Sequence, residues 1–563
     1  MDFLPIIQKY SGLAQWNIPI STPAGLLHIY RPEQADKPQL WKTTLSDIQR
    51  GAPGERLAIF EQEGSPVAVL QGGEQFAVLV QPSGSEQLTL VDSKGAVLHK
   101  NISPFSLPGI DSQGQLLFPP ARRPSGARDR LVETNKVFLI RHIENCTQLF
   151  PANINELGEL EPPKTAPIIE CASPQRLIVS GRMILRLNKN ILESDSGEKY
   201  FLPPHDVFLG LAADPKRRRV AVAIQKDGLT HVVLLSSHKE CWKLLSLSAE
   251  ETFLQIDIHE NTLWICTHGP LKGQRLGWLD FSVTSISQTD NFHWVPSSSS
   301  EDLHLTYTES QALAEDGTEI PYVLVSSSAC ANQMAPILLT VYGAFGICHR
   351  PSAEPTLPAW CSAGGIMVFA QVRGGGERGP NWHKAGSGEN KYQSIKDLVA
   401  VALALKEKHP QQEIVLCGAS MGGLVALISA LEAARNHPSL ISRIAVTSPV
   451  LDVADLSRHR NGSFWGSEFP ASYELRKLLS PLHRLQKYKN DSTRALAPLW
   501  LASSAMDERI ADDASRFIDL WDLYGCAFHW RGEGLGHIGN PVQRINQRAA
   551  HLLSFAWGDT SCE

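Results

Sequence analysis

The second half of the sequence alternates between short apolar segments and amphipathic stretches, and this alternation constrains the fold more than any other feature. The apolar segments have the length and composition of buried strands. They cover residues 337–343, 365–372, 413–419, 443–450, 498–504 and 526–532. Between two of them, residues 394–409 repeat apolar side chains at helical spacing, from Ile395 to Leu403. Strands that alternate with helices predict a mostly parallel, doubly wound sheet with helices on both faces.

Up to about residue 300 the rhythm is different. Short strand-like segments such as 75–82, 219–225 and 262–269 follow one another, and Gly, Pro, Ser and Asp separate them. A sandwich and a propeller both fit this pattern, and the length suits about seven four-stranded blades of roughly 40 residues. We therefore predict a β-propeller-like domain over residues 1–300 and an α/β catalytic domain over residues 301–563.

Composition narrows the class of protein. A chain of 563 residues is too long for one ordinary core, and its net charge of -6 gives no electrostatic reason to expect a nucleic-acid partner. The 10 cysteines lack paired spacing, so we expect buried thiols and neither a metal nor an organic cofactor. The opening residues lack a leader pattern, and no apolar run reaches membrane-spanning length. These features predict a soluble, cytoplasmic protein without a membrane partner.

One serine stands out, in the motif Gly418-Ala419-Ser420-Met421-Gly422. A strand-like segment precedes it and a helix-like run follows directly, which is the context in which a G-x-S-x-G motif carries a nucleophile. The glycines let strand and helix pass closely around a strained turn. We predict Ser420 as the nucleophile, against the alternative of a plain glycine-rich turn, and the Met421 N–H as one oxyanion donor.

A serine hydroxyl needs a base to take its proton, and the base needs an acid that fixes its tautomer. In hydrolases of this kind the acid and the histidine follow the serine in that order. Asp507 lies just after a strand-like segment, and His537 lies in a glycine-flanked loop after the last predicted strand. We predict these two as acid and base, and interpret the rivals Glu508, Asp512 and Asp513 as surface or capping residues.

Several separate segments together resemble the prolyl oligopeptidase family of serine peptidases. They are residues 316–325, 341–346, 371–386, 417–424, 480–483, 507–509 and 536–539, in the order and spacing of the family. The resemblance extends over residues 305–563, is greatest to prolyl endopeptidases, and includes oligopeptidase B. It implies an α/β-hydrolase catalytic domain together with a seven-bladed β-propeller that keeps folded proteins away from the active site.

The resemblance also implies roles for individual residues. Tyr342 matches the tyrosine whose hydroxyl is the second oxyanion donor, and Arg509 matches an arginine that holds a substrate carbonyl. Other positions match the pocket for the residue before the cleaved bond, where an aromatic face can stack on a proline ring. These positions are Phe345, Val450, Trp465, Phe469 and Ile510. Ordinary core packing is the alternative for the pocket residues.

The sequence departs from the family pattern at two places. The opening MDFLPIIQKYSG is much shorter than the N-terminal arm of the family. The acidic residues with which oligopeptidase B binds Arg and Lys side chains are missing, and His349 and Arg350 stand where they would be expected. A basic substrate side chain would find no counter-charge there, which favours proline or another apolar residue before the cut.

Together these patterns predict a serine peptidase that hydrolyses short peptides through an acyl-enzyme and cleaves after proline. The same triad could serve an esterase, an acylaminoacyl-peptide hydrolase or a peptide cyclase. A catalytically idle binding protein is the alternative from another class. A short peptide is the expected partner, a monomer is compatible with the sequence, and the oligomeric state stays open.

Overall fold

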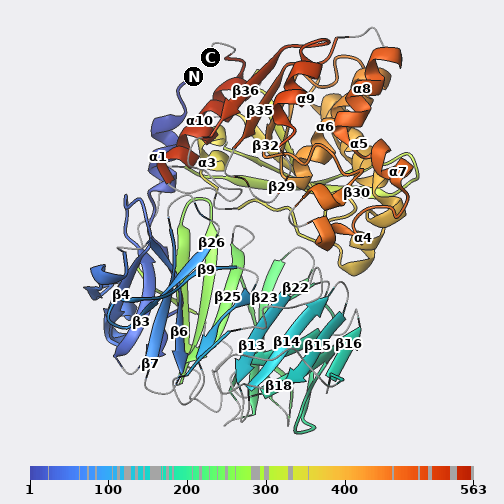
Figure 1. Ribbon diagram of the computed structural model, residues 1–563. Coiled ribbons are helices and arrows are strands. Elements are labelled where there is room, and N and C mark those ends of the chain that lie inside the picture. The colour runs from blue at the N-terminus through green and yellow to red at the C-terminus, as the bar shows by residue number, and fades with distance from the viewer. Residues whose placement is uncertain are drawn as a thin grey trace. The chain divides into compact units, whose positions relative to one another are not determined.

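The structure is a computed structural model of the chain (Figure 1). It describes residues 1–563 apart from a number of segments. These are residues 23, 62–63, 73–74, 83–84, 86, 104–105, 111–114, 119–127, 134–136, 144–145, 153–165, 168, 173–175, 181–182, 206, 215–217, 227–228, 237–238, 248–250, 260, 281–291, 297–302, 328–333, 353, 460–461, 492–494, 505–506, 508–509, 511, 533–541 and 560–563. In the described part of the chain, each helix is too short or too polar to cross a membrane.

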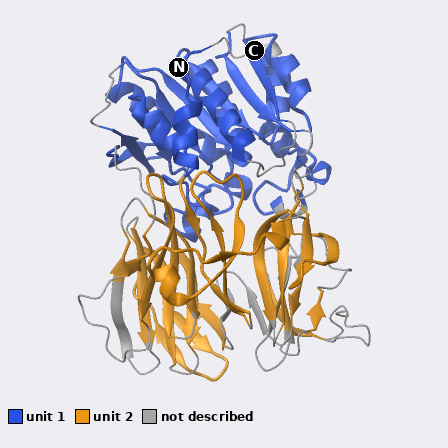
Figure 2. Ribbon diagram, turned by 90° about the vertical axis from the view of Figure 1, so that its left-hand side faces the viewer, with its two compact units in different colours: residues 1–12, 300–563 blue, residues 13–299 orange. Residues whose placement is uncertain are grey.

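The chain divides into two compact units: one combines Met1–Gly12 with Ser300–Glu563, and the other is Leu13–Ser299 (Figure 2). The division expected from sequence placed the first residues with the β-rich half, whereas α1 (Leu4–Ser11) packs in the first unit. The Phe3 ring is fully buried and stacks on Trp360, with ring centroids 6.0 Å apart. The short N-terminal segment is therefore part of the unit that carries Ser420.

An eight-stranded sheet forms the centre of this first unit. Its strands, in spatial order, are β29 (Thr306–Leu313), β30 (Glu319–Ser326), β32 (Ile366–Ala370), β31 (Ile337–Val341), β33 (Ile414–Ala419), β34 (Arg443–Thr447), β35 (Leu499–Ser503) and β36 (Ala527–Arg531). β30 runs antiparallel to both of its neighbours, and all pairs from β32 to β36 are parallel. The predicted mostly parallel sheet is confirmed.

Both faces of this sheet are covered because successive strand residues point to opposite sides. Leu339 and Leu416 face a core with α5 (Tyr392–Lys408), α6 (Met421–Asn436), α8 (Pro481–Asp491) and α9 (Ala514–Trp521). Their neighbours Leu338 and Val415 face a second core with α1, α3 (Thr356–Ser362) and α10 (Val542–Trp557). Figure 1 shows these two groups of helices on opposite faces. α4 (Pro380–Lys384) and α7 (Tyr473–Leu478) lie in the connections.

The second unit consists of antiparallel sheets that follow one another along the chain. The described residues form six successive four-stranded groups and one two-stranded sheet. The groups are β2 (Ile20–Thr22), β3 (Gly25–Arg31), β4 (Gln39–Thr43) and β5 (Glu55–Arg56); β6 (Ser65–Gly72), β7 (Gln75–Gln81), β8 (Leu88–Asp92) and β9 (Val97–Ile102); β13 (Arg128–Glu133), β14 (Val137–Ile143), β15 (Cys146–Pro151) and β16 (Ile169–Ala172); β17 (Arg176–Ser180), β18 (Met183–Asn188), β19 (Ile191–Ser194) and β20 (Lys199–Phe201); β21 (Val207–Asp214), β22 (Arg219–Lys226), β23 (Leu229–Ser236) and β24 (Lys239–Ser246); and β25 (Thr252–His259), β26 (Thr262–Gly269), β27 (Gly273–Asp280) and β28 (His293–Trp294). β10 (Ser106–Leu107) adds to β13, and α2 (Leu45–Gln49) follows β4.

Strand pairing and side-chain packing connect these groups one after another, as the blades of a β-propeller are connected. β1 (Gln15–Trp16) pairs with β27 of the last group and with β3 of the first, so the ends of the series belong to one sheet. The two-stranded sheet of β11 (Gly109–Ile110) and β12 (Leu116–Leu117) lies between the second and third groups, because Leu116 packs in the core of one and Leu117 in that of the other. The predicted propeller is confirmed. The described residues form six four-stranded groups, and this two-stranded sheet is present in addition to them.

Candidate active site

Ser420 occupies a strained turn between β33 and α6. Its backbone has φ 54° and ψ -117°, a conformation that residues other than glycine rarely adopt. Hydrogen bonds fix the turn from both sides: the Ser420 N–H donates to the Thr447 carbonyl at 3.0 Å, and the Val450 N–H donates to the Ser420 carbonyl at 3.2 Å. The serine predicted as nucleophile thus lies on a strained turn. Hydrogen bonds to residues in and just after β34 hold this turn in its conformation.

The glycines of the motif are required by close backbone contacts. A Cβ atom on Gly418 would lie 2.3 Å from the Gly422 carbonyl oxygen. A Cβ atom on Gly422 would lie 2.2 Å from the Val341 carbonyl oxygen, at the end of β31. Since backbone atoms cannot move aside as flexible side chains do, each position accepts only glycine without a shift of β31, β33 or α6.

Replacing Gly422 with alanine is therefore expected to lower the free energy of unfolding by about 1–3 kcal/mol, as other overpacked positions do. It should also slow covalent labelling of Ser420 by a fluorophosphonate, because α6 and the turn must shift. Denaturant unfolding and labelling rates measure the two effects. Gly109→Ala is the control, since its Cβ would meet its nearest neighbour at an ordinary 3.4 Å. Unchanged labelling and stability in Gly422→Ala would contradict this steric account.

Asp507 follows β35, two strands from β33, at the same carboxyl edge of the parallel sheet. Its N–H donates to the Ser504 carbonyl at 3.1 Å, which fixes the start of the loop. Burial lowers the pKa of Arg548 on α10, and the negative charges of Glu354 and Asp507 oppose this shift. The predicted acid therefore lies within electrostatic reach of the half-buried Arg548.

The rival carboxylates have other partners. Asp512 accepts a hydrogen bond from the Ala514 N–H at 3.3 Å, at the start of α9. Asp513 pairs with Arg458 at 2.9 Å. Asp512 thus serves the start of α9, as expected of a capping residue. Asp513 is buried and its side chain makes no capping hydrogen bond, so the interpretation as a surface or capping residue does not hold for it. The third rival, Glu508, lies outside the described residues.

Two predicted residues belong to segments that the structure does not describe. They are His537, in residues 533–541 after β36, and Arg509. β36 itself pairs in parallel with β35, so the chain leaves the sheet at the carboxyl edge that also carries Asp507. The roles of His537 and Arg509 stay predictions.

The two predicted oxyanion donors are neighbours of the serine turn. Met421 is the first residue of α6, directly after Ser420. Tyr342 is half-buried and follows β31, which pairs with β33 in the register Val341↔Gly418. A Cβ atom on Gly422 would lie only 3.1 Å from the Tyr342 Cα. The structure thus brings the Tyr342 backbone against the serine motif.

The predicted pocket residues lie in one hydrophobic cluster with Tyr342. Val450, Trp465 and Phe469 are buried members of the cluster, and Phe345 and Ile510 are half-buried residues that pack against it. Val450 and Phe469 are 0% and 2% exposed, so their main role in this structure is packing. Phe345 and Ile510 offer the larger exposed surfaces to a ligand.

His349 is placed against the sheet. Its Nε2 lies 2.8 Å from the Thr340 hydroxyl, and its ring lies 5.3 Å from that of Phe369. Burial lowers the pKa of His349 to about 4, so the imidazole is neutral at pH 7. The position where oligopeptidase B was expected to carry an acid thus holds an uncharged, packed side chain.

Sequence reasoning missed two buried ion pairs in the unit that carries Ser420. Arg373 donates to Asp397, with Nε 2.9 Å from Oδ2, and Lys391 pairs with Glu468, with Nζ 2.7 Å from Oε1. Charged residues are normally expected at the surface, and the partners are far apart in sequence. The role of Glu468 could have been suspected from its position in the sequence, which lies between the predicted pocket residues Trp465 and Phe469.

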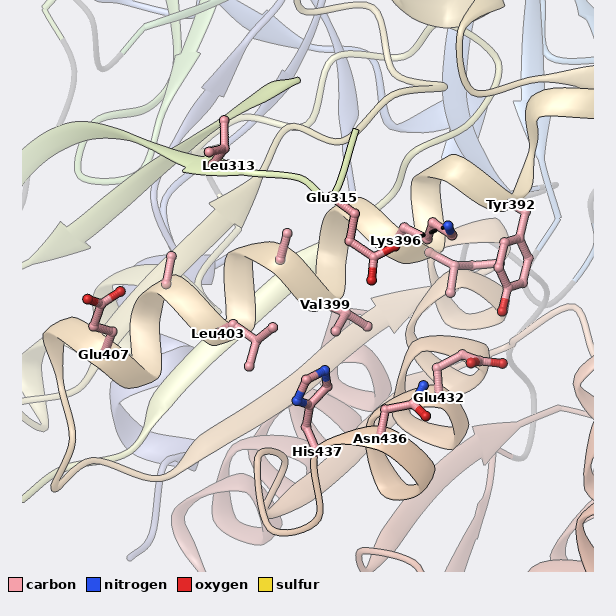
Figure 3. Close-up of a pocket in the computed structure, with 13 residues that line it drawn as sticks. Leu313, Glu315, Tyr392, Lys396, Val399, Leu403, Glu407, Glu432, Asn436 and His437 are labelled. Carbon is pink, nitrogen blue, oxygen red and sulfur yellow. Dashed lines mark hydrogen bonds and ion pairs between the residues drawn. The ribbon is translucent and has the colours of Figure 1, made fainter. Parts of the chain in front are cut away.

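A pocket of about 340 Å³ lies elsewhere, on α5 and α6 (Figure 3). Val399 and Leu403 of α5 face His437 across it (Figure 3). Leu403 belongs to the apolar helical repeat seen in the sequence but is 38% exposed, because the face that packs on the sheet is centred on Leu398 and Val401. The lining contains none of the predicted site residues.

Comparisons with known proteins agree with this geometry. Residues 351–559 match the model of the prolyl oligopeptidase family. A dual function macrocyclase-peptidase, POPB, from Amanita bisporigera is 30% identical over 207 residues, 35% of this chain and 27% of that protein. A prolyl endopeptidase from Dictyostelium discoideum is 31% identical over 186 residues, 31% of this chain and 24% of that protein. The matches thus span about a quarter of the length of these curated relatives.

Similarity of fold extends further than similarity of sequence. A solved structure from a structural and mechanistic analysis of two prolyl endopeptidases superposes with a TM-score of 0.82 at 14% sequence identity. It covers 100% of this chain, which covers 92% of that one. At this identity the likeness establishes the fold, a β-propeller with an α/β-hydrolase domain. Residues 351–559 are therefore similar to the prolyl oligopeptidase family, and the chain as a whole has the fold of a solved prolyl endopeptidase.

Proposed function

We propose that this protein is a serine peptidase that hydrolyses short peptides after proline, in the unit formed by Met1–Gly12 and Ser300–Glu563. The observation that carries the proposal is the strained Ser420 turn at the end of β33, with φ 54°. Strain of this kind exposes a hydroxyl at the top of a sheet and is maintained only where the surrounding structure enforces it. Cytoplasmic location and independence from metals and cofactors belong to the same proposal.

In the proposed mechanism, His537 takes the proton of Ser420 while Oγ attacks the peptide carbonyl, and Asp507 holds the imidazole in the required tautomer. The Met421 N–H and the Tyr342 hydroxyl donate to the oxyanion of the tetrahedral intermediate. His537 then protonates the leaving amine, and water hydrolyses the acyl-enzyme.

The preference for proline is supported by the aromatic residues of the hydrophobic cluster against which Tyr342 packs. A proline ring is compact and apolar and can stack on the ring of the half-buried Phe345, whereas a Lys or Arg side chain would need a carboxylate. Within this cluster the nearby carboxylate, Glu468, is already neutralised by Lys391. The relatives named prolyl endopeptidase point to the same residue before the cut.

A second candidate function is peptide cyclisation, which the name of the Amanita bisporigera relative favours. Cyclisation uses the same acyl-enzyme, with the amino group of the bound peptide in place of water as the attacking group. Ester hydrolysis and removal of acylated amino acids would also use this intermediate. An idle binding protein would form no acyl-enzyme at all.

Incubation with a mixed library of short peptides is expected to give linear products cut after proline, identified by mass spectrometry. The wild-type protein should also react with a fluorophosphonate at one serine. Predominant cleavage after Arg or Lys would contradict the proposed specificity. Cyclic products would establish the cyclase, ester turnover without peptide cleavage would establish an esterase, and absence of any labelling would indicate the idle binding protein.

A further inference from the structure

Lys391 and Glu468 form an ion pair inside the catalytic unit. Their side chains are 0% and 1% exposed, and Lys391 Nζ lies 2.7 Å from Glu468 Oε1. Lys391 directly precedes α5, and Glu468 lies between Trp465 and Phe469 of the predicted pocket. The pair therefore joins α5 to the segment that carries the pocket aromatics.

Both members of the pair also hold the loop that carries Tyr342. Lys391 Nζ donates to the Gly343 carbonyl at 2.8 Å, and the Phe345 N–H donates to Glu468 Oε2 at 3.0 Å. The contacts fall on the residue after Tyr342 and on the third residue after it. Gly343 adopts its φ of 65° freely, but Phe345 has a φ of 57°, which residues other than glycine rarely adopt, so this bend of the loop needs support from its surroundings.

A third group completes the carboxylate's hydrogen bonds. His383 Nε2 lies 2.9 Å from Glu468 Oε2, and this histidine is 32% exposed at its side chain. Burial raises the pKa of Glu468, but the charge of Lys391 and the bonds from His383 and Lys391 outweigh it, and the pKa is lowered. Glu468 is thus an ionised acceptor for three donors from three different segments.

Stability alone does not account for such a pair. A buried ion pair generally stabilises a fold no better than apolar residues of the same volume, because desolvation of the two charges offsets their attraction. Apolar residues cannot, however, replace the directional hydrogen bonds that the two charged groups make. In this unit the directional contacts of the pair end on Gly343 and Phe345, which both follow Tyr342 in its loop.

We propose that Lys391 and Glu468 are positioning residues for the oxyanion donor. They hold the loop of Tyr342 so that its hydroxyl meets the oxyanion, and they couple this loop to the pocket residues Trp465 and Phe469. This inference rests on the proposed function, in which Tyr342 donates to the oxyanion. Neither residue needs to touch the substrate for this role.

A double-mutant cycle with Glu468→Gln and Tyr342→Phe tests the inference. Glutamine keeps the size of Glu468 but loses the charge and one acceptor, so the loop should shift. A misplacement of about 1 Å can cost about 100-fold in rate, and we expect kcat on a proline-containing peptide to fall about 10- to 100-fold, with a smaller change in KM. In the Tyr342→Phe background the same substitution should lower kcat by less than about threefold, because the group it positions is gone.

The matched control is Glu251→Gln in the other unit. Glu251 pairs with Arg275 at 2.7 Å and is 7% exposed, so this variant also breaks a largely buried ion pair. It should leave kcat nearly unchanged in both backgrounds. Equal losses from Glu468→Gln with and without Tyr342, or full kcat in the folded variant, would overturn the inference.

If Glu468→Gln fails to fold, Lys391→Met combined with Glu468→Leu removes both charges without leaving one unpaired. This variant should fold, as measured by circular dichroism, and show the same loss of kcat and the same dependence on Tyr342. Wild-type activity separates the two proposals. An inactive wild-type protein contradicts the proposed function, whereas an active one with additive effects contradicts only the positioning role.

Discussion

Replacing Ser420 with alanine is expected to lower kcat for peptide cleavage by about 10⁶-fold, the size of effect seen when a triad nucleophile is removed. The Oγ atom forms the covalent bond of the acyl-enzyme, and the residual rate would come from binding and the oxyanion donors alone. The backbone should stay in place, because its hydrogen bonds to Thr447 and Val450 do not involve the hydroxyl. Peptide turnover and fluorophosphonate labelling, with the labelled peptide identified by mass spectrometry, measure the effect.

Ser448→Ala provides a matched control. Ser448 directly follows the neighbouring strand β34, is buried, and also has a positive φ of 41°. The same substitution in the same kind of backbone should leave labelling and turnover nearly unchanged. Labelling that persists in Ser420→Ala, or disappears in Ser448→Ala, would show that the nucleophile is a different residue.

The parallel part of the eight-stranded sheet could be predicted because each strand is a local signal. β31, β33, β34 and β35 are continuous apolar runs, buried on both faces, and such runs are visible without knowledge of their partners. β29 has no such run: most of its residues are exposed or half-buried at the sheet edge. An edge strand of this kind has little pattern to distinguish it from a loop.

Contacts between distant segments were harder to predict. The propeller strands were recognisable one by one, but β1 joins the first and last groups through a pairing of Gln15 with Gln274. The place of α1 depends likewise on Phe3 and its stacking on Trp360. Neither pairing leaves a periodic signal, so sequence reasoning assigned the N-terminal segment to the β-rich half.

The residues of the candidate site also differ in how readily the sequence predicts them. The turn at Ser420 is encoded by five adjacent residues, since the steric need for Gly418 and Gly422 is local. Lys391 and Glu468 are 77 positions apart, and each alone resembles an ordinary surface charge. Physical reasoning on sequence therefore finds the group that reacts more readily than the groups that position it.

Asp507→Asn is expected to lower kcat by about 10⁴-fold, because the asparagine amide can donate its N–H to the near imidazole nitrogen. This bond holds the tautomer in which the nitrogen that faces Ser420 already carries a proton and cannot take the serine proton. The acid has to be distinguished from its neighbours, and Asp512→Asn does this with the same chemical change five positions along the loop. Asp512 accepts the Ala514 N–H at 3.3 Å, a capping bond that asparagine can also accept, so this variant should keep its activity.

Fluorophosphonate labelling separates the role of Asp507 from that of the nucleophile. In Asp507→Asn the label should still attach to Ser420, but slowly, because the hydroxyl is present while its base is in the wrong tautomer. Thermal unfolding of both variants should match the wild type closely, which would exclude loss of the fold as the cause. If Asp507→Asn kept its turnover while Asp512→Asn lost it, the acid would be Asp512, and the loop after β35 would have to bring α9 toward the serine.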